Sequence, residues 1–266
     1  MAKENLIISR FKINVAKSKK GKPKPLSALL ISTKDENLIK SKNTIVIICH
    51  GFSDTKESLQ FFYLALVSQG YIILTYDARG TKGSKKVGKK HQFIDRIEDY
   101  KKVIKWIRKQ DSLKLKHIFS VGFSIGAMTI LCGSFADKQV SKIVAISSLS
   151  SFRENLRNFN PIILLNYLLK GVNIFPRDDK NRQLSPYHIM SELKKKLPYN
   201  EWESYANRVL LIHAKNDKVI KYFNFKQNRD LLELSPQNLL IFKKGGHTQK
   251  KNELALVGKT LSFLAF

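Results

Sequence analysis

The chain is poor in cysteine. Only two of its 266 residues are cysteine, Cys49 and Cys132, and both lie in apolar segments. Two such cysteines exclude a disulfide framework and a cysteine-rich zinc module, and they fit a reducing compartment. We therefore expect a cytoplasmic protein that is stabilised by its core.

Long apolar runs are also missing. No stretch approaches the roughly 18–20 uninterrupted apolar residues of a transmembrane helix. The most apolar stretch, 161–175, is broken by polar residues and glycine. The first twenty residues alternate apolar and charged side chains and lack the apolar region of a signal peptide. The sequence therefore predicts neither a membrane span nor a signal peptide.

Acidic residues are scarce. There are 21 Asp and Glu against 48 Lys and Arg, so the formal net charge is +27. Much of the excess lies in lysine runs within 17–24, 82–90 and 194–196. No zinc-finger, RNA-recognition or basic-zipper pattern accompanies these runs, so we expect no specific nucleic-acid partner. A basic surface of this kind still attracts polyanions at low salt, which leaves weak association with anionic membranes open.

The sequence contains enough apolar residues to form a core, and strand-like and helix-like segments alternate along it. Hydrophobic residues make up 43% of the chain, and the length favours one domain or one domain with an insertion. Short apolar segments predict strands at 44–49, 71–76, 117–123, 142–147, 208–213 and 239–242. Helical patterns lie at 57–68, 93–107, 125–135 and 253–264. Strands that are apolar on both faces and alternate with helices predict an α/β fold with a mostly parallel central sheet and helices on both faces.

The alternation is interrupted once, which predicts an inserted cap. Residues 149–205 contain apolar residues at helical spacing, punctuated by prolines, and we interpret them as a small helical cap. The core then consists of 1–148 and 206–266. The apolar residues of 162–169 are expected to pack over the active site, and the first forty residues to form an antiparallel hairpin at the sheet edge.

The sharpest motif is Gly122-Phe123-Ser124-Ile125-Gly126, which lies between a predicted strand and a predicted helix. A serine on such a sharp turn has a strained backbone that lifts its oxygen out of the sheet. Bulky side chains two positions away would collide with the turn, so glycine is needed at both ends. The context predicts that Ser124 is a nucleophile.

A nucleophilic serine needs a base, and the base needs an orienting acid. Asp217 directly follows the strand at 208–213, and His247 follows the strand at 239–242. They lie 93 residues after Ser124 and a further 30 residues on, in the order Ser, Asp, His. We therefore predict a catalytic triad of Ser124, Asp217 and His247, with no metal.

The oxyanion of such a reaction needs two backbone donors. The first is the N–H of Ile125, directly after the nucleophile, and the second is expected in the loop His50-Gly51-Phe52, where we select the N–H of Phe52. His50 is expected to hold this loop by hydrogen bonds. The other histidines have no comparable placement and are interpreted as structural or surface residues: His91, His117, His188 and His213.

With these motifs, the segment from Thr44 to Phe266 resembles the α/β-hydrolase fold superfamily. The resemblance rests on the loop at 50–52, the turn Asp77-Ala78-Arg79-Gly80, the serine motif, Asn216-Asp217 and Gly246-His247. It is greatest to the serine aminopeptidase, prolyl-oligopeptidase-type and dienelactone-hydrolase-like branch. It implies hydrolysis of an ester, thioester or amide in a small acyl compound or short peptide, without a cofactor.

Other functions on the same fold stay open at this stage. Motifs do not separate a carboxylesterase from a peptidase or an acyltransferase, because specificity lies in the cap. A membrane-surface lipase would use the basic charge and the apolar stretch at 162–169. A non-catalytic binding protein is disfavoured by the intact Ser, Asp and His. The oligomeric state cannot be deduced from the sequence.

Overall fold

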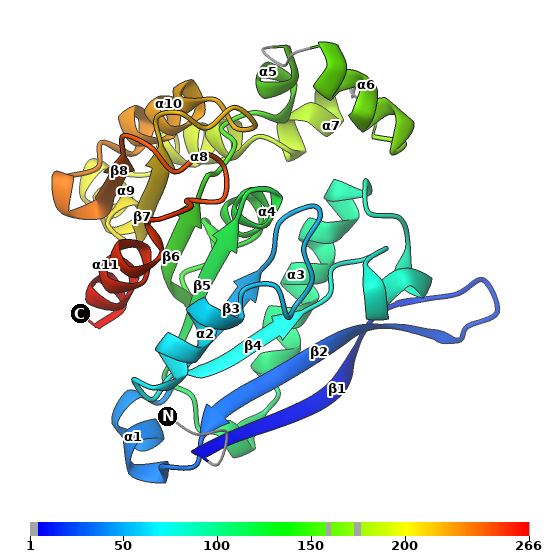
Figure 1. The fold of residues 1–266 in the computed structure, drawn as a ribbon, viewed down its shortest axis with the longest axis vertical. Coiled ribbons are helices and arrows are strands. Elements are labelled where there is room, and N and C mark those ends of the chain that lie inside the picture. Colours follow the sequence, from blue (N-terminus) through cyan, green and yellow to red (C-terminus); the bar gives the residue numbers. More distant parts are fainter. Residues whose placement is uncertain (1–4, 158–160, 173–176, 266) are drawn as a thin grey trace.

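The structure is a computed structural model that describes residues 5–157, 161–172 and 177–265. Within these residues, eight strands form one sheet in the order β1-β2-β4-β3-β5-β6-β7-β8 (Figure 1). The strands are β1 (Leu6–Lys17), β2 (Pro23–Thr33), β3 (Thr44–Cys49), β4 (Ile72–Tyr76), β5 (His117–Phe123), β6 (Val140–Ile146), β7 (Val209–Ala214) and β8 (Leu239–Phe242). The pairs from β4 to β8 are parallel, whereas β1 and β2 form the predicted antiparallel hairpin at one edge.

Helices cover both faces of the sheet, as the two-sided apolar strands predict. Ile45 and Ile47 of β3 face one core, and Val46 and Ile48 face the other, because successive side chains point to opposite sides. The first core contains side chains of α3 (Phe93–Ile107), α4 (Ile125–Ser134) and α10 (Tyr222–Leu232). The second contains side chains of α2 (Gln60–Val67) and α11 (Glu253–Ala265).

One helix near the start of the chain is not predicted from the sequence. Helix α1 (Glu36–Lys42) begins after Asp35, whose carboxylate accepts from the N–H of Leu38 at 3.0 Å, and it ends at Asn43 in a left-handed conformation. None of its residues is buried. It therefore offers no apolar stripe that a periodicity search could find, and its caps are its only signal.

In the described part of the segment between β6 and β7 there are five helices. They are α5 (Phe152–Arg157), α6 (Pro161–Leu169), α7 (Asp178–Gln183), α8 (Pro186–Lys194) and α9 (Tyr199–Ala206). Figure 1 shows α5, α6 and α7 beyond the end of the sheet. Met190 of α8 and Trp202 of α9 instead belong to the first core. The predicted cap, 149–205, thus contains two helices that pack on the α/β core.

Helix α6 corrects one expectation. The apolar residues at 162–169 do not all pack inward: Leu165 is 57% exposed, Leu168 48% and Leu169 80%. Leu164 packs against the buried cluster around Phe152. The reason is geometric, since a nine-residue helix that is apolar on most sides can turn only one narrow stripe toward the core. Among the described residues, no helix has both the length and the hydropathy to cross a membrane.

Candidate active site

The predicted nucleophile lies on the sharp turn between β5 and α4. Ser124 has φ 56° and ψ −120°, a strained conformation for a residue with a side chain. A Cβ on Gly122 would lie 2.6 Å from the backbone nitrogen of Ala127, and one on Gly126 would lie 2.0 Å from the carbonyl oxygen of Cys49. The predicted need for glycine on both sides of the serine is therefore confirmed.

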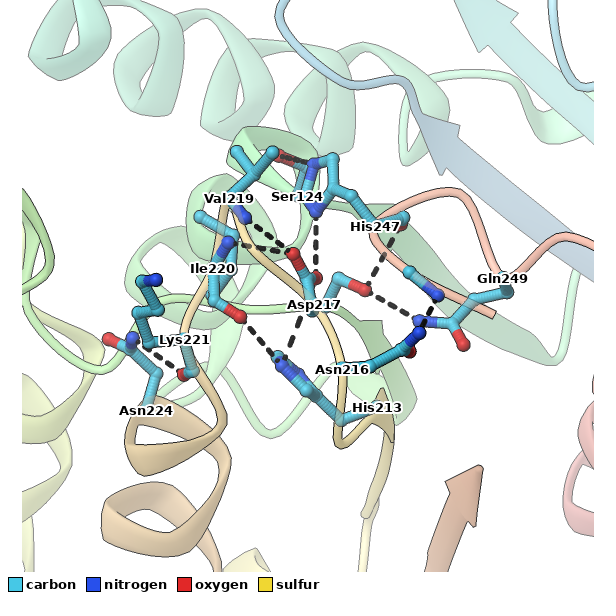
Figure 2. A network of polar contacts seen from close by, with 12 residues as sticks. Ser124, His213, Asn216, Asp217, Val219, Ile220, Lys221, Asn224, His247 and Gln249 are labelled. Atoms are coloured by element: carbon cyan, nitrogen blue, oxygen red, sulfur yellow. Dashed lines mark hydrogen bonds and ion pairs between the residues drawn. The ribbon is translucent and has the colours of Figure 1, made fainter. Parts of the chain in front are cut away.

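The three predicted triad residues meet at the carboxyl end of the sheet (Figure 2). The hydroxyl oxygen of Ser124 lies 2.9 Å from Nε2 of His247. Nδ1 of the same imidazole lies 2.8 Å from Oδ2 of Asp217. With the proton on Nδ1 donated to the carboxylate, Nε2 can accept from the serine hydroxyl, as a general base must.

Asp217 is held as an ionised acceptor. Its side chain is buried, and Oδ1 accepts from the N–H groups of Val219 at 2.8 Å and Ile220 at 2.9 Å. Burial opposes ionisation of the carboxyl, but the hydrogen bond from His247 and the contacts with Ile220 and His213 outweigh it, so the pKa of Asp217 is lowered. One carboxylate oxygen thus fixes the loop while the other orients the imidazole.

The loop that carries His247 is anchored by polar residues that sequence reasoning missed. The N–H of Gly246 donates to Oδ1 of Asn216 at 2.9 Å. The hydroxyl of Ser147 donates to the carbonyl of His247 at 3.4 Å, and the amide of Gln249 donates to that hydroxyl at 2.8 Å. Asn216 stands beside Asp217 in the sequence, but nothing local indicates that Ser147 and Gln249 meet.

A second histidine lies behind the triad. Nε2 of His213 donates to the carbonyl of Ile220 at 2.9 Å and is 3.9 Å from Oδ2 of Asp217. Burial lowers the pKa of His213, so it is neutral and supports the loop, in line with the structural interpretation. Among the described residues, no three His, Cys, Asp or Glu side chains are arranged to hold a metal ion.

The loop after β3 approaches the nucleophile closely. A Cβ on Gly51 would lie 3.7 Å from Cβ of Ser124 and 2.6 Å from a carboxylate oxygen of Asp54, so a larger residue would touch the serine and displace the Asp54 side chain. Phe52 follows, and its ring packs against Phe93 at a centroid distance of 5.8 Å. Ile125, the other predicted donor, opens α4, where the first N–H groups have no acceptor within the helix.

His50 holds this loop, as the sequence predicts. Its Nδ1 donates to the carbonyl of Gly51 at 2.7 Å, and its Nε2 accepts from the N–H of Ala78 at 2.9 Å. Burial and the nearby charge of Arg96 lower the pKa of His50 to about 3. The imidazole is therefore neutral at ordinary pH and acts as a bridge between the loops after β3 and β4.

Two charged residues beside this loop were missed. The buried guanidinium of Arg96 donates to the carbonyl of His50, and its Nε has no hydrogen-bond partner within the described part of the chain. Burial lowers the pKa of Arg96, yet the group stays cationic. The carboxylate of Asp54 lies close to Gly51. Within the helical pattern of 93–107 a single arginine gives no sign that its charge is buried.

The turn after β4 is tied down by ion pairs. Asp77 accepts from Nζ of Lys56 at 2.8 Å and from the N–H of Gly83 at 3.1 Å. Arg79 donates twice to the carboxylate of Asp99, at 2.8 and 2.7 Å. Both acids are buried, so these pairs fix the loop beside His50 rather than face solvent.

The comparisons with known proteins agree with this architecture. Residues 44–169 match a family model described as alpha/beta hydrolase fold. The esterase Pf2001 of Pyrococcus furiosus superimposes with a TM-score of 0.65 at 18% identity, covering 98% of this chain and 92% of that one. Est1E of Butyrivibrio proteoclasticus, solved with ferulic acid bound, gives 0.67 at 17% identity, covering 96% and 98%.

A peptidase with the same fold is also similar. The acylaminoacyl peptidase of Pyrococcus horikoshii superimposes with a TM-score of 0.70 at 15% identity, but the match covers 98% of this chain and only 41% of that one. No curated protein sequence matches the chain significantly. At these identities the likeness is one of fold. Together with the sheet order and the turn at Ser124, it shows that the chain has the α/β-hydrolase fold.

Proposed function

We propose that the protein is a serine hydrolase that cleaves an ester, thioester or amide bond through an acyl-Ser124 intermediate. The observation that carries the proposal is the continuous hydrogen-bonded line from the hydroxyl of Ser124 through His247 to Asp217, with links of 2.9 and 2.8 Å. Such a line is the arrangement in which an imidazole can take the serine proton while a carboxylate stabilises the resulting cation.

Acylation uses the strained position of Ser124. His247 removes the hydroxyl proton through Nε2 as the serine oxygen attacks the acyl carbon. The carbonyl oxygen becomes negative and accepts from the N–H groups of Phe52 and Ile125. When the tetrahedral intermediate collapses, the leaving alcohol, thiol or amine takes the proton from His247, and the acyl group stays on Ser124.

Deacylation repeats these steps with water. His247 takes a proton from the water as its oxygen attacks the acyl carbon, and the second oxyanion is bound in the same place. Collapse returns the proton to the serine oxygen and releases the carboxylic acid. Asp217 stays ionised throughout, in keeping with the lowered pKa of its carboxyl.

A small carboxylesterase or peptidase-like hydrolase is the substrate class we favour. One similar fold, Pf2001, is named an esterase, and another, Est1E, was solved with ferulic acid bound; both are covered almost completely by the match to this chain. The acylaminoacyl peptidase is matched over less than half its length, so its substrate preference transfers less readily. Specificity depends on what surrounds Ser124, and fold alone does not define it.

A fluorescent fluorophosphonate tests the nucleophile directly. The reagent should label the wild-type protein, while Ser124→Ala should not be labelled and should not hydrolyse short p-nitrophenyl esters. Ser53→Ala is the matched control, because Ser53 is an exposed serine on the loop beside Gly51. Circular dichroism establishes that each variant is folded.

The same experiment would reveal a different nucleophile or a protein without hydrolytic activity. Labelling of Ser124→Ala would mean that another residue is the nucleophile. A folded wild-type protein that is neither labelled nor active on any acyl substrate would instead indicate a binding protein on the same fold.

A further inference from the structure

Helix α6 exposes apolar side chains at the active-site end of the molecule. Leu165, Leu168 and Leu169 are between 48% and 80% exposed, and the equally apolar Leu164 faces the buried cluster. Apolar side chains gathered on one short helix are not ordinary surface scatter, because a group of this kind marks a contact with another phase or molecule. Figure 1 shows α6 at the upper right, beyond the end of the sheet.

Lysines surround the end of this helix. Lys89, Lys90 and Lys170 line a hollow of about 440 Å³ together with Phe52, Ser53 and His91. A Cβ on Gly171, just after α6, would lie 3.0 Å from Cε1 of His91, so the helix end and the loop at 88–91 touch. The three lysines are exposed. We call Lys89, Lys90 and Lys170 the lysine rim.

The basic surface continues along the same edge. Helix η2 (Lys82–Val87) adds exposed Lys82, Lys85 and Lys86, and its Ser84 accepts from the N–H of Ser27 on β2 at 2.9 Å.

The tip of the β1–β2 hairpin adds five more lysines. Ala28 of β2 pairs with Tyr76, the last residue of β4, so the preceding residues of β2 extend past the carboxyl edge of the sheet. The tip carries Lys17, Lys19, Lys20, Lys22 and Lys24, and neither 17–24 nor 82–91 contains an acid. The hairpin reaches out on the right of Figure 1.

We infer that α6 and the lysine rim form a docking surface for an anionic lipid membrane. A nine-residue helix rises roughly 13 Å, too little to span a bilayer, but it can lie in the interface with its leucines among the acyl chains. The lysine rim then meets anionic headgroups, to which each lysine contributes about five-fold in binding. Nucleic acid would use the lysines but not the leucines. The inference goes beyond the proposed hydrolysis and does not depend on it.

Vesicle sedimentation tests the surface without any chemistry at Ser124. The full chain should bind vesicles of phosphatidylcholine with phosphatidylglycerol at low salt and be released at high salt, and it should bind pure phosphatidylcholine weakly. Lys89→Gln, Lys90→Gln and Lys170→Gln together should lower binding about 100-fold. Ser124→Ala should bind as the wild type does, which separates this test from that of the nucleophile.

Matched control variants distinguish binding through this particular surface from binding that depends only on the net charge of the protein. Lys105, Lys109 and Lys116 are exposed lysines at or near the opposite, amino edge of the sheet, and replacing all three by Gln removes the same charge. This control should change binding by no more than about three-fold, since salt screens charges beyond about 10 Å. Leu165→Ser with Leu169→Ser should lower binding about ten-fold, whereas Ile7→Ser with Ile8→Ser, on the exposed start of β1, should not.

Three results would overturn the inference. Equal losses in the two lysine triples would mean that only net charge matters. Unchanged binding in the leucine variant would mean that α6 does not enter the lipid. Release from vesicles by a small amount of single-stranded RNA, bound more tightly and through the same lysines, would identify nucleic acid as the partner.

Discussion

The Ser124–His247–Asp217 cluster and helix α6 lie at the same end of the sheet but are built in opposite ways. Around Asp217, which is 4% exposed, backbone and side-chain donors fill the acceptor positions of the carboxylate. On α6, Leu169 is 80% exposed. A group that must act at a fixed distance is held by burial and hydrogen bonds, whereas a surface that meets a fluid partner needs no fixed neighbours.

The largest effect should come from breaking the Ser124–His247–Asp217 cluster. Ser124→Ala and His247→Ala should each lower kcat about 10⁶-fold, and Asp217→Asn about 10⁴-fold, because the three act as a unit. Steady-state hydrolysis of a soluble p-nitrophenyl ester measures this. Leu165→Ser with Leu169→Ser should keep kcat on that ester within about two-fold. A similarly large loss of kcat in the leucine variant would mean that α6 is as important for hydrolysis as the Ser124–His247–Asp217 cluster.

The next effect concerns the close approach of α4 to β3. Gly126→Ala places a Cβ 2.0 Å from the carbonyl oxygen of Cys49, so the backbone must move. We expect a loss of about 3 kcal/mol in the free energy of unfolding, together with lower activity as Ser124 shifts. Urea denaturation compares it with Gly258→Ala on α11, where a Cβ meets nothing within 4 Å and the helix should gain up to about 1 kcal/mol. Equal stability of the two variants would contradict the tight packing.

Acid should have an effect that is smaller for each pH unit. The pKa of His50 is about 3 in the folded protein, while the unfolded chain binds this proton near 6.5. The unfolded state therefore binds more protons between these values, and the contribution of His50 is complete above pH 6.5 and is lost as pH falls toward 3. His213, whose pKa is also lowered by burial, adds in the same direction.

Denaturation at a series of pH values should show this loss, at up to about 1.4 kcal/mol per pH unit for His50. The exposed His117 gives the control: His117→Gln should keep the same pH dependence. An NMR titration in which the His50 resonances move near pH 6.5 would contradict the prediction.

The smallest effect is expected on α6. Leu169→Ala should change the free energy of unfolding by less than about 0.5 kcal/mol, because its side chain already lies in water. Leu156→Ala on α5, with Leu156 4% exposed, should cost about 2–4 kcal/mol. Thermal or urea unfolding of the two variants sharpens the contrast between an exposed and a buried leucine in neighbouring helices.

Helices and strands with a regular spacing of apolar residues could be predicted from the sequence. The helix at 93–107 has the bounds that its apolar spacing indicates, and the strands at 117–123 and 239–242 likewise. Ser124, Asp217 and His247 could be found because each follows such a strand, and parallel strands bring their carboxyl ends together. Their catalytic roles remain predictions.

Features that depend on distant partners could not be predicted. The contact of Gln249 with Ser147 and the burial of Arg96 behind His50 join segments that no local pattern relates. The burial pattern of helix α6 could not be predicted for a different reason. Its sequence is apolar on most sides, so it does not indicate which side chains pack against the core. Burial on an evenly apolar helix is decided by its neighbours.

The order of the triad along the chain has a consequence for biosynthesis. Ser124 and His247, its proposed base, are 123 residues apart, and His247 follows β8, which pairs with β7 at the edge of the sheet. At about 5–20 residues per second, a ribosome makes the serine roughly 10 s before the histidine. On the proposed mechanism, the nascent chain carries during that interval a nucleophile without its base, so it should not turn over acyl compounds before β8 is in place.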